Sequence, residues 1–139
     1  MRPSSWVFDT NVVVSGLLSV HGPPARLLDA LLAGNLRLTW TDRIAAEYRD
    51  VLSRPRLAIP AVRREAFLAI LSLGDHVAPS ASSHTRLPDL DDLPFLEAAL
   101  HATDRILVTG NLRHFPMACC GEVRVLTPAK ALVRLDDGS

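Results

Sequence analysis

The sequence lacks the features of a secreted or membrane-spanning protein. Its only two cysteines, Cys119 and Cys120, are adjacent and too few for a disulfide framework. No apolar run approaches the roughly 20 residues of a membrane span, and the first residues lack the apolar stretch and cleavage site of a signal peptide. We therefore expect a cytoplasmic protein with reduced thiols and no membrane partner.

Net charge and aromatic side chains are also scarce. Fifteen basic residues balance fifteen acidic ones, so no net field attracts a polyanion. Aromatic residues make up 5% of the chain, which argues against the base-stacking surface of a single-strand-binding protein. Fourteen of the basic residues are arginines and Lys130 is the one lysine. Arginine suits phosphate oxygens, although a coding bias is the simpler explanation.

The chain is of ordinary size and composition for one folded unit. It has 139 residues, of which 48% are apolar and 22% charged. This composition excludes disorder as the main state and predicts a single domain over residues 1–139, with a core from about residue 5 to about residue 135.

Short apolar runs alternate with segments of helical spacing. Strands are predicted at residues 6–8, 36–40, 105–109 and 123–126, with a short one closed by Val77. Helices are predicted at residues 12–18, 23–32, 61–73 and 93–102, from Thr41 or Asp42 through Leu52, and from Pro128 through Leu132. Residues 78–89 read as a surface loop and residues 136–139 as a fraying tail. This alternation predicts an α/β fold, a three-layer α/β/α sandwich with a small, mostly parallel central sheet.

Acidic residues follow or precede the predicted strands, and ligands of parallel sheets bind beyond the carboxyl ends of the strands. Asp9 ends the first strand, Asn111 follows the end of a later one, and Asp91 or Asp92 opens the helix that leads into that strand. Glu47 lies on or next to the buried face of its helix. Carboxylates this close repel one another unless a cation separates them, and Mg²⁺ or Mn²⁺ prefers such oxygen ligands.

Each of these residues, taken alone, has a plainer explanation. Asp9 and Asn111 are common turn residues, Asp91 or Asp92 suits a helix cap, and Glu47 suits a solvated helix surface. The functional interpretation therefore depends on their joint placement at one end of the sheet.

Several segments, in order along the chain, resemble the PIN-domain ribonucleases, in particular a bacterial branch of VapC-like toxin components. These segments are residues 7–11 (VFDTN) with Ser15, 23–25 (PPA), 44–48 (IAAEY), 51–57 (VLSRPRL), 89–97 (DLDDLPFLE) and 108–116 (VTGNLRHFP). The resemblance covers residues 7–126, nearly the whole chain, and implies a small parallel sheet and a metal-dependent nuclease.

The resemblance also implies roles for single residues. The catalytic residues would be Asp9, Glu47, Asp92 and Asn111. The metal ligands would be Asp9, Glu47 and Asp92, with Asp91 as the alternative to Asp92. Asn11, Ser15 and Thr109 would surround and orient the ligands, and Arg113 and His114 would contact substrate phosphate. The implied reaction is hydrolysis of single-stranded RNA by a water that Mg²⁺ or Mn²⁺ activates.

One residue departs from the family pattern. Many members carry an acid at or just beyond the position of Asn111, which is neutral here. We therefore expect one tightly held ion, with any second ion recruited by substrate phosphate. A catalytically weak or silent module that binds RNA or a protein remains the alternative.

The resemblance further implies the toxin of a type II toxin–antitoxin pair, with a small antitoxin protein as its partner. A homodimer is expected, and its contacts could include Leu28, Leu31 and Leu32, although core packing is the simpler explanation for these leucines.

Two other classes of protein fit the residues less well. A phosphoacceptor signalling domain would use Thr109 and Lys130 but needs an aspartate after a middle strand, where only Asp42 is available. A haloacid-dehalogenase-like phosphatase needs an acid two residues after its nucleophile, where Asn11 stands.

Overall fold

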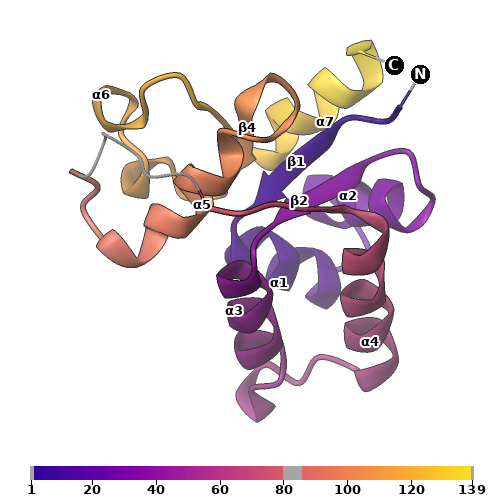
Figure 1. The fold of residues 1–139 in the computed structure, drawn as a ribbon. Coiled ribbons are helices and arrows are strands. Elements are labelled where there is room, and N and C mark those ends of the chain that lie inside the picture. The colour runs from indigo at the N-terminus through magenta and orange to yellow at the C-terminus, as the bar shows by residue number, and fades with distance from the viewer. Residues whose placement is uncertain (1, 80–85, 139) are drawn as a thin grey trace.

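A computed structural model describes residues 2–79 and 86–138 of the chain. Within these residues, five strands form one sheet in the order β3-β2-β1-β4-β5, and every neighbouring pair is parallel (Figure 1). The strands are β1 (Ser5–Phe8), β2 (Arg37–Trp40), β3 (Asp75–His76), β4 (Ile106–Val108) and β5 (Arg124–Leu126). The expected small parallel sheet is confirmed.

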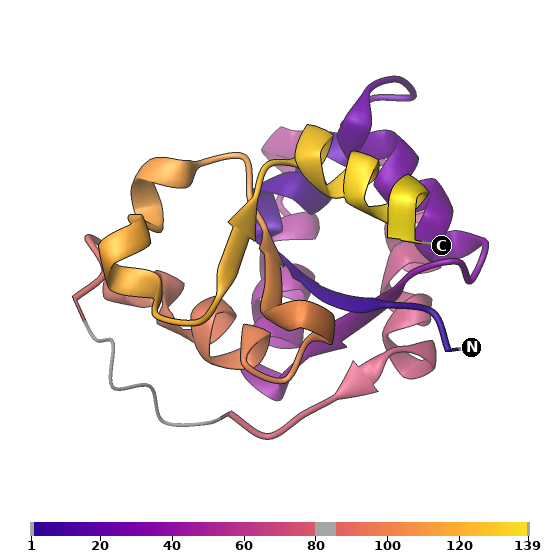
Figure 2. The same cartoon turned by 90° about the horizontal axis from the view of Figure 1, so that it is seen from above.

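Helices cover both faces of this sheet. The helices are α1 (Thr10–Leu18), α2 (Pro23–Leu32), α3 (Asp42–Leu52), α4 (Ala61–Ala69), α5 (Leu93–Ala99), α6 (Met117–Cys120) and α7 (Pro128–Gly138). Short 3-10 turns are η1 (Pro55–Leu57), η2 (Ile70–Leu73), η3 (Leu90–Asp92), η4 (Thr103–Arg105) and η5 (Leu112–His114). Figure 2 shows the sheet between α2 and α7 on one side and α5 on the other, which confirms the α/β/α sandwich.

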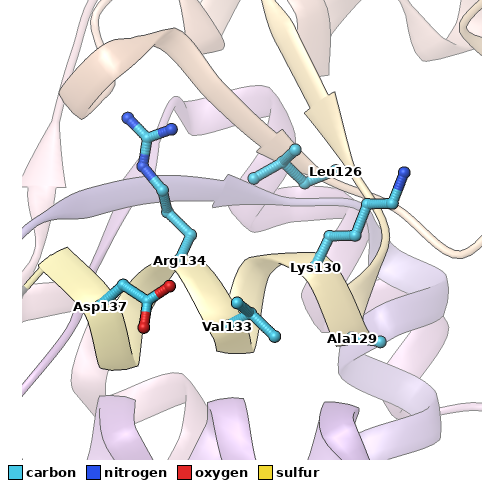
Figure 3. A pocket seen from close by; sticks show the side chains of 6 residues that line it. All are labelled: Leu126, Ala129, Lys130, Val133, Arg134 and Asp137. Carbon is cyan, nitrogen blue, oxygen red and sulfur yellow. The ribbon is translucent and has the colours of Figure 1, made fainter.

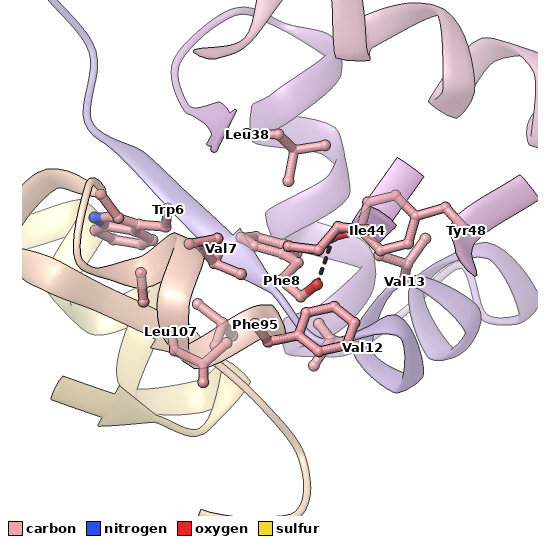
Figure 4. Packing of buried hydrophobic residues seen from close by; sticks show 14 of the residues in the cluster. Trp6, Val7, Phe8, Val12, Val13, Leu38, Ile44, Tyr48, Phe95 and Leu107 are labelled. Carbon is pink, nitrogen blue, oxygen red and sulfur yellow. Dashed lines mark hydrogen bonds between the residues drawn. The ribbon is translucent and has the colours of Figure 1, made fainter. Parts of the chain in front are cut away.

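The core is built around the central strand β1, all of whose residues are buried. Phe8 lies in the middle of the buried cluster, which includes Ile44 of α3 and Phe95 of α5 (Figure 4). Tyr48 of α3 is fully buried, and its hydroxyl donates a hydrogen bond to the Phe8 carbonyl at 2.5 Å. This bond fixes α3 against the carboxyl end of β1.

Two capping interactions decide where the helices near that end begin. Thr41 caps α3 by accepting a hydrogen bond from the Ile44 amide at 3.3 Å, as one of the two alternatives predicted. Asp92 stands at the N-terminal cap position of α5, as one of the alternatives predicted, but its side chain makes no capping hydrogen bond. Asp89 caps the preceding turn η3 by accepting a hydrogen bond from the Asp91 amide at 2.9 Å, and η3 then leads into α5. The carboxylate of Asp92 is consequently available for other contacts.

Several predicted boundaries differ from the structure. The tail is helical through Gly138 instead of frayed, because Leu132 and Leu135 pack against the core one turn apart. Helix α5 ends at Ala99, and the strand after it starts at Ile106, since Arg105 has a φ of 51° that no strand residue adopts.

Other differences are local. Strand β3 lies just before Val77, whose amide still donates to the Trp40 carbonyl at 2.9 Å. Val62 of α4 is 82% exposed, because Phe67 is the residue of this helix that the core buries. The short helix α6 was not predicted. Residues 80–85 of the predicted loop lie outside the described residues.

The leucines of α2 mostly serve the core. Leu28 and Leu31 are buried, whereas Leu32 is exposed, so core packing is confirmed for the first two. Across residues 2–79 and 86–138, every helix is too short or too polar to cross a bilayer.

Gly74, which precedes β3, provides a test of the sheet packing. A β-carbon at Gly74 would lie 2.3 Å from the carbonyl oxygen of Leu38 in β2, so backbone would have to move. We expect Gly74→Ala to lower the free energy of unfolding by about 1–3 kcal/mol in urea titrations. Gly110→Ala is the matched control, because nothing lies within 4 Å of its added carbon. Equal stability of the two variants would contradict the packing described for β2 and β3.

Candidate active site

Asp9 is a buried carboxylate at the carboxyl end of β1. Asp9 is 4% exposed, and its Oδ2 accepts a hydrogen bond from the Thr109 hydroxyl at 2.8 Å. The backbone amides of Thr10 and Asn11, at the start of α1, also favour the charge of this carboxylate. Burial nevertheless raises the pKa of Asp9 above its ordinary value, although these donors oppose the shift.

The sheet register explains why Thr109 reaches Asp9. Phe8 pairs with Val108, so the residues that follow the two strands are neighbours, and the Asp9 amide donates to the Val108 carbonyl at 2.9 Å. Thr109 is fully buried, and its hydroxyl oxygen also accepts from the Asn111 amide at 3.1 Å. Asn111 is therefore tied to this edge by its backbone.

Asp92 lies at the same edge, at the junction of η3 and α5. Its side chain is 15% exposed, and its Oδ2 lies 3.0 Å from Nδ1 of His114. Within the described part of the chain this buried oxygen makes no well-formed hydrogen bond, and its close neighbour is the ring of His114. Burial, followed by the negative charge of Asp9, raises the pKa of Asp92 to about 6, and His114 partly offsets both effects. Asp9 and Asp92 are thus close enough to repel each other.

Glu47 reaches the edge from α3. Its side chain is half-buried and accepts a hydrogen bond from the hydroxyl of Thr10, the residue after Asp9. Tyr48, next to it, is buried within reach of both charges. Burial first, and then Asp9 and Glu47, raise the pKa of Tyr48 well above its ordinary value. The phenol therefore stays protonated and keeps its bond to Phe8.

The remaining predicted site residues take less central positions. Asp91 is exposed, whereas Asp92 contacts His114 and is coupled to Asp9, so the geometry favours Asp92 over Asp91. Asn11 and Ser15 are exposed on α1, and only Asn11 contacts Asp9, through its backbone. Arg113 is exposed beyond β4, beside the half-buried His114.

The predicted ligands meet at one edge, but each has a different neighbour. Thr109 holds Asp9, Thr10 holds Glu47, and His114 lies against Asp92. In residues 2–79 and 86–138, no three metal-ligating side chains are grouped closely enough to hold an ion as they stand. The assignment of Asp9, Glu47 and Asp92 as ligands therefore stays a prediction.

Sequence reasoning missed three residues that position this edge. Thr10 binds Glu47, Tyr48 anchors α3 to β1, and Asp89 takes the capping position. The signals for them are local. Thr10 directly follows Asp9, Tyr48 lies at helical spacing from Ile44 and Leu52, and Asp89 stands directly before a helical turn.

The surface has one cavity beside the carboxyl ends of the strands and another away from the predicted site residues. One, of about 650 Å³, opens next to the carboxyl ends of β2 and β3. The other, of about 420 Å³, lies along α7, and none of the predicted site residues lines it (Figure 3). Its lining residues are Leu126, Ala129, Lys130, Val133, Arg134 and Asp137.

Comparison with known proteins agrees with this architecture. The family model described as PIN domain matches residues 5–113, which include every predicted site residue except His114. No curated protein and no solved structure is similar enough to count as a match. PIN domains are generally nucleases that use divalent metal ions. The match spans well over half of the chain, and with the parallel sheet it shows that this protein belongs to the PIN-domain family.

Proposed function

We propose that the protein is an endoribonuclease that cleaves single-stranded RNA with the help of Mg²⁺ or Mn²⁺. The observation that carries the proposal is the coupled pair Asp9 and Asp92 at the carboxyl edge of the sheet. Both carboxylates are mostly buried, and both have raised pKa values. A protein whose only need was stability gains nothing from two carboxylates that repel each other.

The chemistry of this edge fits a hard divalent cation. Asp92 Oδ2 is a buried oxygen that makes no well-formed hydrogen bond within the described residues, and a cation between Asp92 and Asp9 would remove the repulsion between their charges. Asp9 and Asp92 would hold the ion, with Glu47 as the third ligand once its side chain turns from Thr10. When bound, the ion supplies an acidified water and a positive charge beside the phosphate.

The protein's own groups prepare this edge for the reaction. The Thr109 hydroxyl orients the Asp9 carboxylate through its hydrogen bond, and the amides of Thr10 and Asn11 favour the carboxylate's charge. His114 and the exposed Arg113 lie beyond β4, where they can contact the phosphates that flank the cleaved bond. The absence of a charge at Asn111 supports a single resident ion.

The lack of a negative charge at Asn111 also favours a second candidate function, that of a silent module that binds RNA without cutting it. Asn111 contributes a backbone amide to Thr109 but no negative charge. The two functions differ in their need for an ion, because binding to a phosphate backbone through arginines requires none.

The biological role that we propose is that of the toxin in a type II toxin–antitoxin pair. The support is the series of motifs along the chain that resemble those of the bacterial VapC-like toxin components. The partner would be a small antitoxin that covers the acidic edge, by which we mean the surface formed by Asp9, Glu47 and Asp92. The exposed Leu32 of α2 is a candidate contact in a homodimer.

Replacement of Asp9 tests the catalytic proposal. We expect Asp9→Asn to reduce Mn²⁺-dependent cleavage of a fluorescent single-stranded RNA by more than about a hundredfold, because loss of a ligand exceeds loss of an outer partner. The folded structure should persist, as measured by circular dichroism. Asp29→Asn, on the exposed face of α2, is the matched control and should cleave like the wild type. Full activity of Asp9→Asn would remove the site from consideration.

The raised pKa of Asp92 predicts a characteristic dependence of stability on pH. Because the pKa of Asp92 is about 6 in the folded chain and lower in the unfolded chain, folding favours the protonated form. This contribution is present below about pH 4 and is lost as the pH rises through about 6. In EDTA at neutral pH, we therefore expect Asp92→Asn to unfold several degrees above the wild type, with the two melting together at acid pH.

Addition of Mn²⁺ should reverse that order. The ion stabilises the wild type by binding its folded state, whereas Asp92→Asn lacks a ligand and gains little. Asp29→Asn again serves as the control and should follow the wild type throughout. If Asp92→Asn melts below the wild type at neutral pH in EDTA, Asp92 has a structural function and the proposed ion site is wrong.

The toxin role is tested in cells that carry the gene alone or with the adjacent small open reading frame. We expect expression alone to arrest growth, Asp9→Asn to relieve the arrest, and co-expression to restore growth through a complex that purifies together. Normal growth with the gene alone, and no complex, would contradict the role but not the nuclease activity measured with purified protein.

A further inference from the structure

The cavity beside β2 and β3 continues the acidic edge. It has a volume of about 650 Å³, and its lining includes Thr41, Asp42, Arg43, His76, Pro94 and Glu97. Helix α3 lines it with its first turn and carries Glu47 in the next. Helix α5, which packs against α3, lines it with Pro94 and begins directly after Asp92. A strand of RNA with a phosphate at the acids could therefore place an adjoining nucleotide at this cavity.

A preformed aromatic stack stands at the cavity. The His76 ring lies on the Trp40 ring with centroids 4.3 Å apart and an angle of 24° between the planes. Trp40 is fixed by its Nε1, which donates to the Leu71 carbonyl at 2.8 Å. His76 is fixed by its Nε2, which lies 2.8 Å from Oδ1 of Asp42. Half of the His76 side chain, 52%, is nevertheless exposed, so the ring retains free surface.

The polar groups of the cavity suit the edge of a base better than a phosphate. Asp42 and Glu97 are acceptors whose negative charge repels phosphate, and Arg43 is a donor. Carboxylates accept hydrogen bonds from the exocyclic amino groups of bases, as in the pairing of Glu or Asp with cytosine. A flat ring beside two carboxylates and one guanidinium is an arrangement that can hold one unpaired base by stacking and by its edge.

We propose that this cavity binds one unpaired nucleobase of the RNA substrate, stacked on His76, and that it prefers a base with an exocyclic amino group over uracil. The inference rests on the proposed ribonuclease function and adds a specificity-determining site to it. A scarcity of Phe, Trp and Tyr does not argue against such a site, because a single histidine stacked on one tryptophan provides the surface.

The test measures coupling between His76 and one nucleotide. Fluorescent single-stranded RNAs of about eight nucleotides, each with an abasic nucleotide at a different position, are bound to the protein in EDTA and then in Ca²⁺. With the wild type, we expect the abasic nucleotide at one position to weaken binding roughly tenfold. His76→Ala should weaken binding of the intact RNA by a similar factor and lose all sensitivity to that position.

Two variants control this experiment. His76→Phe keeps a ring for stacking but not the contact with Asp42, so it should restore most of the affinity. His21→Ala removes an exposed histidine from the connection between α1 and α2 and should bind like the wild type. Exchange of cytosine for uracil at the sensitive position should weaken binding to the wild type and leave binding to His76→Ala unchanged.

The outcomes separate this inference from the function on which it rests. If the wild type binds and cleaves RNA but His76→Ala keeps the same abasic profile, the base site is wrong and the nuclease stands. If His76→Ala lowers affinity equally for every RNA, His76 contacts the backbone or shapes the fold, and the base site is again wrong. If no RNA binds in either solution, both proposals fall.

Discussion

The arrangement of this protein depends on one buried carboxylate, that of Asp9, and on the groups that stabilise its charge. Burial disfavours that charge, whereas the Thr109 hydroxyl and the amides at the start of α1 favour it. Asp9 directly follows β1, Thr109 directly follows the neighbouring strand β4, and the amides belong to the first turn of α1, so the carboxylate is satisfied only when β1, β4 and α1 are in register. The charge of Asp9 is therefore stabilised only when the strands are arranged in the correct order.

The contacts of Asp92, the second acid at this edge, depend on which residue caps the turn that precedes it. Because Asp89 caps η3, Asp92 stays free to lie between Asp9 and His114, where its charge is unfavourable. The energy that this placement costs is recovered only when something positive arrives, either a proton or a cation. Tyr48 has the opposite property, since its phenol stays neutral beside the same charges and keeps α3 in place.

Much of the fold could be predicted from the sequence, because it follows from patterns within a few residues. Apolar runs, Thr41 and the helical spacing of leucines locate most elements, and the order of strands and helices predicts a parallel sheet. What could not be predicted depends on contacts between distant segments. The helical tail through Gly138 depends on packing of Leu132 and Leu135, and the exposure of Val62 depends on which face of α4 the core requires.

The site shows the same division. Asp9 and Asp92 could be named from their positions at strand and helix ends, and Glu47 from its place on its helix. Their contacts with Thr10, Thr109 and His114 could not be predicted, because contacts between distant segments have no signature along the chain. The stack of Trp40 and His76 was likewise invisible, since its members are 36 residues apart in the numbering and meet only through the pairing of β2 with β3.

The bond between Thr109 and Asp9 joins residues 100 positions apart, and this separation has a consequence for synthesis. Strand β1 leaves the ribosome early, yet the neighbour that satisfies its acid is translated after most of the domain. A nascent chain therefore has no assembled carboxylate edge until β4 emerges, so any nuclease activity of this edge begins only after most of the domain has been translated.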